Sequence, residues 1–446
     1  MAAETLETTC AIAGGGPAGI MLGYLLARQG VPVIVLEKHK DFFRDFRGDT
    51  VHPSTLELMY ELGLLEDFLK LPHQQITSVG GVFGRFRFDA ANVSHVRAHC
   101  KFVALMPQWD FLDFLADRAN RFPHFDLRMQ HEVLNLTQDA NRITGVEVRT
   151  PEGTKHVKAD LVVGCDGRHS TLRKAAGLEV LEFGVPIDVL WFRISRNGGD
   201  PERLLGTVNY GKALVLINRA DYFQAGFIIR KGSFEEMQRL GLQAFRDSIC
   251  HIAPYLCDRV HELQDWDQIK LLSVQINRLT RWYRPGLLCI GDAAHAMSPA
   301  GGVGINLAIQ DAVAAANRLA RPLEQGTVTE ALLAQIQKRR EFPTRVTQAM
   351  QVNAHKGFEY IFQHPGPIRA PWQFKTVTRI PGLQRVMGRL IGIGVRPEHI
   401  PDAPNRLARK RRVQRIAVSL GIAAAIAVTA AGLLTSSRPK KHAHNC

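Results

Sequence analysis

The residues best suited to do chemistry lie in 287–320, where a predicted apolar strand runs into a glycine-rich loop and then a helix. Asp292 stands at the strand end, where a carboxylate can accept hydrogen bonds from ribose-type hydroxyls. Pro299 stiffens the loop, and three glycines let backbone N–H groups approach a flat ligand: Gly301, Gly302 and Gly304. The helix behind them presents its positive N-terminal end to that ligand. This stretch therefore predicts a site for a flat ligand that carries negative charge.

A second motif lies near the N-terminus, where Gly14-x-Gly16-x-x-Gly19 joins a predicted strand to a predicted helix. Gly14 allows a tight turn, Gly16 lets the backbone approach a pyrophosphate, and Gly19 lets helix and strand pack closely. A second strand ends at Glu37, 18 residues beyond Gly19, where a carboxylate can take the hydroxyls of an adenosine ribose. This order predicts dinucleotide binding, but it does not by itself separate FAD from NAD.

A third motif, Asp166-Gly167-Arg168-His169-Ser170 followed by Arg173, comes directly after a predicted hairpin with its tip at 151–153. The second strand of that hairpin ends on a carboxylate that can hold the loops around a dinucleotide. Gly167 permits a close approach of the backbone.

Together the three motifs resemble those of the group A FAD-dependent monooxygenases, in the same order and at similar spacing. These are aromatic hydroxylases similar to para-hydroxybenzoate hydroxylase and to the hydroxylases of ubiquinone biosynthesis. The resemblance covers roughly residues 8–400. It implies an FAD site made of Gly14, Gly16, Pro17, Ala18, Gly19, Glu37, Arg47, Gln108, Asp166, Gly167, Gly291, Asp292, Pro299, Gly301, Gly302, Gly304, Ile305 and Asn306.

Some of these positions carry a more specific expectation from the resemblance. Arg47 matches an arginine that reaches the FAD pyrophosphate in the family, and Gln108 matches a position that contacts FAD. We expect Asp292 to lie where there is little water and Glu37 to be partly solvated. On that basis Asp292 should contribute more to FAD affinity than Glu37.

The resemblance also implies the reaction. In the family, NAD(P)H docks transiently and reduces the flavin, which then takes up O2 to form a C4a-hydroperoxide that hydroxylates an electron-rich ring. The chain is thus expected to be an NAD(P)H-consuming monooxygenase acting on an aromatic or quinone-like small molecule. Only one G-x-G-x-x-G is present, so the sequence offers no second dinucleotide fold. No catalytic side chain can be named, and no cluster of metal ligands stands out.

Three other functions are weighed against the hydroxylase. A flavoprotein reductase or dehydrogenase of the same fold would act without inserting oxygen, and labelled O2 would distinguish it. A flavin-dependent halogenase would carry a W-x-W-x-I-P run, but the five tryptophans are nowhere two residues apart. A flavin-containing scaffold would use the C-terminal tail for recruitment and would turn over NAD(P)H only trivially.

The elements that position the motifs predict an α/β protein with a discontinuous, Rossmann-type FAD-binding domain in 8–75, 104–178 and 276–330. A smaller substrate domain of β-sheet and helix is expected in 76–103 and 179–275. The alternating Phe and Arg of 83–88 predict one strand of its sheet with one face covered. Residues 331–405 are expected to form a helical cover broken at several prolines, of which Pro343 is the first.

Five side chains of the substrate domain are candidates for lining the substrate pocket, although each is more typical of core or surface: Trp191, Arg193, Tyr210, Tyr222 and Phe223.

Bulk composition excludes little, but it constrains the partners. Apolar residues are 46% and charged residues 22% of the 446, as in a globular protein with a large core. The net charge is +14, but nine Lys/Arg and no acid lie beyond residue 405, which leaves +5 for the body and does not indicate nucleic acid. Seven scattered cysteines without a C-x-x-C pair favour a reducing, cytosolic setting.

The C-terminal tail predicts a membrane anchor. Ile416–Leu434 is a run of 19 residues without a charge. As a helix it would span roughly 28 Å, close to a hydrocarbon core of about 30 Å. Six Lys/Arg precede it in 406–415 and three follow in 438–441, so the flavin domain should stay in the cytosol. Such an anchor would suit a lipophilic substrate, and the alternative is a buried or surface helix.

Overall fold

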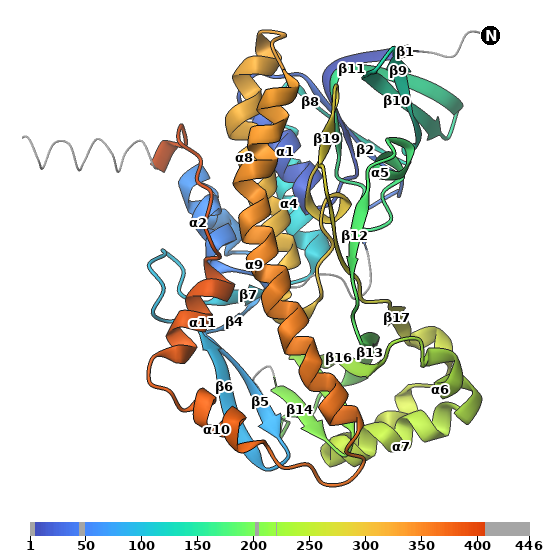
Figure 1. Ribbon diagram of the computed structural model, residues 1–446, viewed down its shortest axis with the longest axis vertical. Coiled ribbons are helices and arrows are strands. Elements are labelled where there is room, and N and C mark those ends of the chain that lie inside the picture. Colours follow the sequence, from blue (N-terminus) through green and yellow to red (C-terminus); the bar gives the residue numbers. More distant parts are fainter. Residues whose placement is uncertain (1–4, 44–49, 201–204, 220, 406–446) are drawn as a thin grey trace, which may run out of the picture.

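The computed structural model describes residues 5–43, 50–200, 205–219 and 221–405. Two β-sheets lie one above the other along the longest axis, and helix α9 (Glu330–Phe362) runs past both of them (Figure 1). The α/β architecture expected from the sequence is confirmed. Arg47 and the predicted span 416–434 fall outside the described residues.

The first sheet has eight strands, with the order β19-β20-β11-β1-β2-β8 and with β9 and β10 extending from β11. Neighbouring strands from β20 to β8 are parallel, so their carboxyl ends share one edge. The strands are β1 (Thr5–Ala13), β2 (Val33–Glu37), β8 (Phe125–Met129), β9 (Glu132–Asp139), β10 (Arg142–Thr150), β11 (Gly153–Gly164), β19 (Tyr283–Arg284) and β20 (Leu287–Cys289).

Apolar residues on both faces explain why these strands are central. In β2 all five residues are buried, with Val33 and Val35 in one core cluster and Ile34 and Leu36 in another. The helices that contribute to the first cluster include α1 (Pro17–Arg28), α4 (Gln108–Ala119) and α8 (Gly304–Glu324).

Shorter elements complete the upper part of the molecule. Three strands form a small sheet, β3 (Thr50–Val51), β7 (Val103–Leu105) and β4 (Gln74–Ile76), and two more pair as β12 (Val180–Phe183) and β18 (Ile276–Leu279). The helices here are α2 (Pro53–Leu62), α3 (Leu65–Phe68) and α5 (Thr171–Ala175).

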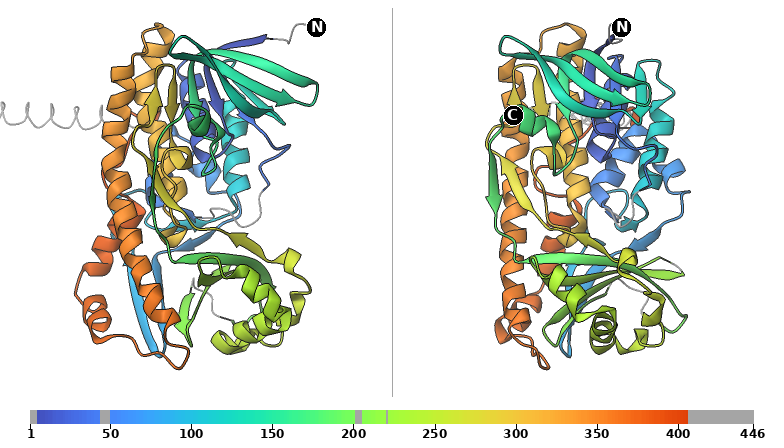
Figure 2. Two further views of the ribbon diagram at one scale, coloured as in Figure 1. Left: turned by 45° about the vertical axis from the view of Figure 1, so that its right-hand side comes forward. Right: turned by 90° about the vertical axis from the view of Figure 1, so that its right-hand side faces the viewer.

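The second sheet has seven strands in the order β17-β13-β16-β15-β14-β5-β6. They are β5 (Ser78–Phe83), β6 (Phe86–Asn92), β13 (Ile187–Ser195), β14 (Leu205–Asn209), β15 (Lys212–Asn218), β16 (Tyr222–Arg230) and β17 (Lys270–Leu272). Helices α6 (Phe234–Leu240) and α7 (Leu242–Ile252) lie on the side away from the first sheet (Figure 2). The other side of the second sheet therefore faces the first sheet.

One prediction for this region is wrong, because residues 83–88 do not form a single strand. The alternating Phe and Arg of 83–88 are split between β5 and β6, because Gly84 turns the chain with a φ of +62°. Three phenylalanines of this hairpin do share a covered face: Phe374 packs against the rings of Phe83, Phe86 and Phe88.

The C-terminal part is helical, as expected, and continues with α10 (Trp372–Thr378) and α11 (Leu383–Gly392). The expected break at Pro343 is wrong, because α9 is continuous through it. Side chains on either side of the proline hold the helix in place, Arg340 through an ion pair and Gln348 through hydrogen bonds. Among the described helices, none combines the length and apolar character needed to cross a membrane.

Candidate FAD site

The three predicted motifs meet at the carboxyl edge of the first sheet. Ala13, at the end of β1, pairs with Gly164 of β11, and Gly164 pairs with Cys289 of β20. The turn at Gly14, the loop at Asp166 and the loop at Asp292 therefore leave three adjacent strands side by side. Segments more than a hundred residues apart in the chain are brought together by this register alone.

The glycines of the first turn have distinct steric roles. A Cβ at Gly14, where φ is +102°, would lie 2.4 Å from the carbonyl oxygen of Cys165, and one at Gly19 would lie 2.0 Å from the carbonyl oxygen of Gly14. Gly16 differs, since among the described residues, its chain neighbours apart, a Cβ there would meet no atom within 4 Å. Packing therefore requires the outer two glycines, whereas the space in front of Gly16 is free for a ligand.

Glu37 is more enclosed than the sequence suggested. Its side chain is 11% exposed, and its carboxylate accepts hydrogen bonds from the backbone N–H groups of Gly15 (2.9 Å) and His39 (3.0 Å). Asp292, expected to be the drier carboxylate, has a side chain that is 29% exposed. The premise that ranked Asp292 above Glu37 is thus reversed in the structure.

Two arginines of the Asp166–Arg173 motif connect it to the loop at Asp292. The Arg168 guanidinium lies 3.3 Å from the Asp292 carboxylate, and Arg173 donates to the carbonyl oxygens of Ala293 and Arg168. Burial raises the pKa of the Asp166 carboxyl, against hydrogen bonds from Ser170 and the Leu172 N–H. One Asp166 oxygen and one Arg168 nitrogen are buried without a partner among the described residues. They are groups that a polar ligand at this edge would satisfy.

The glycine-rich loop after Asp292 is fixed on one side by contacts with Thr50. Gly301 and Gly302 have φ values of +80° and +61°, which favour glycine, and a Cβ at Gly302 would lie 2.1 Å from the Thr50 hydroxyl. That hydroxyl donates to the Gly302 carbonyl at 2.9 Å. The loop leads directly into Gly304, the first residue of α8, so the N-terminus of a 21-residue helix stands behind it.

The Asn306 side chain is fully used within the protein. Its oxygen accepts from the His52 N–H and the Thr55 hydroxyl, and its nitrogen donates to the carbonyls of Thr50 and Gly302. It ties α8 to β3 and α2, which leaves only its main-chain groups for a ligand.

The remaining predicted residues lie close to these loops in the chain. Gln108 is half-buried at the start of α4, Pro17 and Ala18 form the first turn of α1, and Ile305 follows Gly304 in α8. Gly167 has a φ of +84° with open space around it, and a Cβ at Gly291 would lie 3.1 Å from that of Ala308. Arg47 lies outside the described residues.

These features fit FAD. The free space at Gly16 suits a pyrophosphate at the N-terminus of α1, and Glu37 and Asp292 stand at strand ends where ribose or ribityl hydroxyls can donate to them. The positive-φ glycines and the start of α8 suit the flat ring.

A comparison with protein families decides the assignment, since the family model described as FAD binding domain matches residues 7–350. The chain belongs to this FAD-binding family. The resemblance to group A FAD-dependent monooxygenases is confirmed, and the protein is an FAD-dependent oxidoreductase.

Three relatives illustrate the relationship. The 6-methylpretetramide 4-monooxygenase of Streptomyces rimosus is 29% identical over 87% of this chain and 93% of its own length. The dialkyldecalin synthase of Streptomyces rugosporus is 27% identical over 90% of this chain and 82% of its own length. Among solved structures, the anhydrotetracycline hydroxylase OxyS from Streptomyces rimosus aligns with a TM-score of 0.69 at 25% identity, covering 87% of this chain and 76% of that one.

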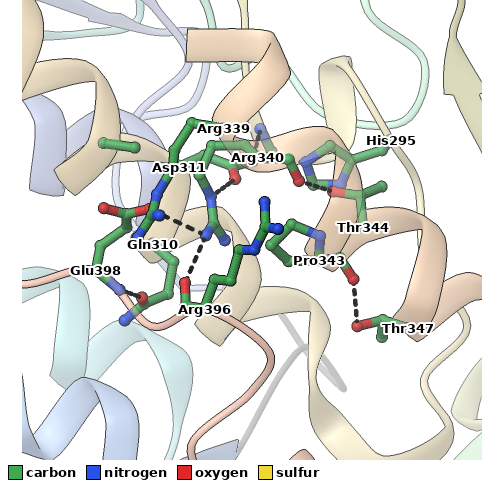
Figure 3. A network of polar contacts seen from close by, with 12 residues as sticks. His295, Gln310, Asp311, Arg339, Arg340, Pro343, Thr344, Thr347, Arg396 and Glu398 are labelled. Carbon is green, nitrogen blue, oxygen red and sulfur yellow. Dashed lines mark hydrogen bonds and ion pairs between the residues drawn. The ribbon is translucent and has the colours of Figure 1, made fainter. Parts of the chain in front are cut away.

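Beneath the loop at Asp292 of this oxidoreductase lies a buried ionic network that was not predicted. Asp311 of α8 accepts a hydrogen bond from the Gly291 N–H at 3.1 Å and pairs with His295 at 2.5 Å and Arg340 at 2.8 Å. Figure 3 shows Arg340 reaching from α9 between Asp311 and Glu398. The network thus connects the loop at Asp292 to the C-terminal segment.

The same face of α9 holds the glycine-rich loop from behind. Gln351 accepts from the Ser298 N–H and donates to the carbonyls of Ser298 and Ala300, and His355 lies 2.9 Å from the Ser298 hydroxyl. The buried polar residues of this face are Gln337, Arg340, Thr344, Gln348, Gln351 and His355. Their three- and four-residue spacing is a helical stripe that could have been found in the sequence.

The reversed burial of the two carboxylates leads to a prediction. Asp292→Ala should weaken FAD binding about tenfold, since a hydrogen bond to a charged acceptor contributes about 1.5–3 kcal/mol. Glu37→Ala should weaken it at least as much and also lower the melting temperature, because it leaves the buried Gly15 N–H without a partner. FAD titration and thermal unfolding measure both effects.

The matched variant is Glu37→Gln, whose amide oxygen can still accept from Gly15. It should recover most of the stability lost in Glu37→Ala. A larger loss of affinity for Asp292→Ala than for Glu37→Ala would restore the original ranking.

Proposed function

We propose that this oxidoreductase hydroxylates an aromatic or quinone-like small molecule at the expense of NAD(P)H. In the overall reaction a substrate C–H bond, O2, NAD(P)H and a proton give a C–OH group, water and NAD(P)+. Bound FAD supplies the redox chemistry, accepting a hydride and then activating O2. The observation that carries the proposal is the gathering of all three motifs at one sheet edge, below which lies a second sheet with an apolar face.

That apolar face is distinguished by Trp191 of β13. The flanking residues Leu190 and Phe192 pack in the cluster beneath α7, whereas Trp191 turns to the opposite face and packs with Val215 and Ile217. Its indole N–H is buried and has no partner among the described residues. A ring substrate with a hydroxyl or carbonyl oxygen would supply an acceptor there.

Helix α9 connects this face to the FAD loop. Phe358 packs in a cluster with Trp191, and its ring centroid lies 6.1 Å from that of His355, which contacts Ser298. The other side chains weighed for the pocket lie elsewhere. Phe223 is in the core beneath α7, Arg193 stacks on Tyr222 at 5.1 Å, and Tyr210 contacts His251 at 4.2 Å.

Different residues of the site would bind different parts of FAD and the substrate. The turn at Gly14–Gly19 and, by the resemblance, Arg47 would hold the pyrophosphate, and Glu37 and Asp292 the hydroxyls. The loop from Pro299 to Gly304 would hold the ring, oriented by Gln351 and His355. The apolar sheet face would position the substrate and exclude water.

Labelled oxygen tests the reaction. We expect one labelled atom from 18O2, and none from labelled water, in the product formed from a phenolic or quinone-like substrate that stimulates NAD(P)H oxidation. Product without label would indicate a reductase, a dehydrogenase or, given the dialkyldecalin synthase among the relatives, a reaction without net redox change. In the last case product would form without consuming NAD(P)H.

We also propose that Ile416–Leu434 anchors the protein in a membrane and keeps the catalytic part in the cytosol. Support comes only from the sequence, with its uncharged run and basic flanks. Full-length protein should require detergent for extraction, whereas a chain ending at Pro404 should not. Release of the full-length protein by carbonate or salt would instead indicate a peripheral basic helix.

A further inference from the structure

Exposed apolar side chains are concentrated on α10, α11 and the turn between them. Four of the eleven large hydrophobic side chains that are exposed in the described part of the chain lie within residues 372–386: Trp372, Val377, Ile380 and Val386. Trp372 is 72% exposed and Val386 56%. Scattered apolar residues on a surface need no explanation, but a cluster containing a tryptophan marks a binding surface.

The charge of this segment is one-sided. Residues 360–397 contain six Lys/Arg and not one Asp or Glu. Arg385 and Arg389 are exposed on α11, where they flank Val386, and Arg379 is exposed just before the turn. An apolar cluster within positive charge complements a surface that is both apolar and negative.

The inner sides of both helices are fixed, so the outer residues cannot turn inward. Phe374 of α10 inserts among the phenylalanines of the β5–β6 hairpin. On α11, Gly388 lies so close to β6 that a Cβ would be 1.9 Å from the Asn92 carbonyl oxygen. The two helices therefore present their outer residues from a rigid support.

We propose that this surface, the α10–α11 face made of Trp372, Val377, Ile380, Arg385, Val386 and Arg389, docks on an anionic lipid bilayer. Tryptophan and valine would enter the headgroup boundary while the arginines stay at the phosphates. A protein partner would need a complementary shape, but a bilayer needs only apolar tips within positive charge.

The position of the face agrees with this assignment. Helices α10 and α11 and the chain at residue 405 lie along one side of the molecule (Figure 1). The sequence after residue 405 is first basic and then uncharged. The proposal does not depend on whether the tail spans the membrane, because the face consists only of described residues.

Tryptophan fluorescence of the full-length protein reports on the face and not on the tail, because the tail contains no tryptophan. Of the five tryptophans only Trp372 is exposed; the others are buried or half-buried. With vesicles of brominated phosphatidylcholine and phosphatidylglycerol, we expect quenching equal to the emission that Trp372 contributes. Trp372→Phe should abolish that quenching, and Arg385→Gln with Arg389→Gln should reduce it.

A control removes an equally exposed hydrophobe elsewhere. Leu240, 70% exposed on α6 beside Glu235 and Glu236, should be replaceable by serine without effect on quenching. Equal quenching of wild type and Trp372→Phe overturns the proposal. So does equal quenching by vesicles of phosphatidylcholine alone. A dimer that is dissociated by Val386→Asp, without any lipid quenching, overturns it in favour of a second copy of the chain.

Discussion

Gly16→Val is expected to remove FAD from the protein while leaving the chain folded. The backbone at Gly16 has φ −74° and ψ −177°, which valine adopts readily, and the added Cβ would meet no atom of the described residues within 4 Å, its chain neighbours apart. The added Cβ therefore clashes with none of these residues, and the side chain fills the space in front of the N-terminus of α1. A pyrophosphate needs that space to reach the backbone N–H groups.

The measurement is flavin content after purification, together with the melting temperature of the apo-protein. We expect flavin retention below about a tenth of wild type, which corresponds to a loss of affinity of more than tenfold. The melting temperature of apo Gly16→Val should stay close to that of wild-type apo-protein, because the change at the helix start costs only about 1 kcal/mol.

Two other glycines serve as controls. Gly198→Val, in an exposed loop with open space, should retain FAD fully. Gly14→Ala should lower stability even without FAD, because its Cβ would lie 2.4 Å from the Cys165 carbonyl oxygen. A Gly16→Val protein that purifies yellow with full flavin content would contradict the assignment of this turn to the pyrophosphate.

The motifs were predictable because each is encoded by neighbours in the sequence. The turn at Gly14, the acid at the end of β2 and the glycines after Asp292 are local signals, in which residue type alone dictates backbone shape. Parallel pairing of the four strands β2, β1, β11 and β20 then brings them together without further information. Burial was harder to predict, since the enclosure of Glu37 comes from Gly15 and from His39 after the strand.

The supporting contacts could not be assigned because their partners are remote in the chain. Arg340 binds Asp311 29 residues away and Glu398 58 residues away. The polar stripe of α9 is visible in the sequence, but in a surface helix it would simply face water. Pro343 predicted a break in the helix because proline disfavours a helix interior. Tertiary contacts on both sides of Pro343 outweigh this local propensity.

The second large effect is expected at Arg340. Its guanidinium is 1% exposed and lies between the Asp311 and Glu398 carboxylates, which are 0% and 7% exposed. Arg340→Met keeps an unbranched apolar stem but leaves two buried carboxylates with fewer cationic partners. Breaking a buried pair by removing one partner typically costs about 3–5 kcal/mol. We therefore expect the free energy of unfolding to fall by roughly that amount.

The neighbouring arginine is the matched control. Arg339 also pairs with Glu398, at 2.6 Å, but its side chain is 35% exposed. Solvent screens such a pair, so Arg339→Met should cost about 1 kcal/mol or less. Urea unfolding of both variants measures the difference. Equal losses in the free energy of unfolding would show that burial does not strengthen the Arg340 pair.

Acid unfolding gives a separate readout of the same network. Burial alone would raise the pKa of the Asp311 carboxyl, but His295 and Arg340 outweigh it and hold that pKa below its ordinary value. A depressed carboxyl pKa contributes stability above the unfolded-state pKa, and that contribution is lost as the pH falls through the folded-state value. Without Arg340 the folded-state pKa of Asp311 rises, so Arg340→Met should unfold at a higher pH than wild type.

Because Asp311 also holds the Gly291 N–H, the same variant should release FAD at a higher pH than Arg339→Met does. Flavin fluorescence during an acid titration of the two variants measures the pH of FAD release. Coincident release curves would show that the network does not affect FAD binding.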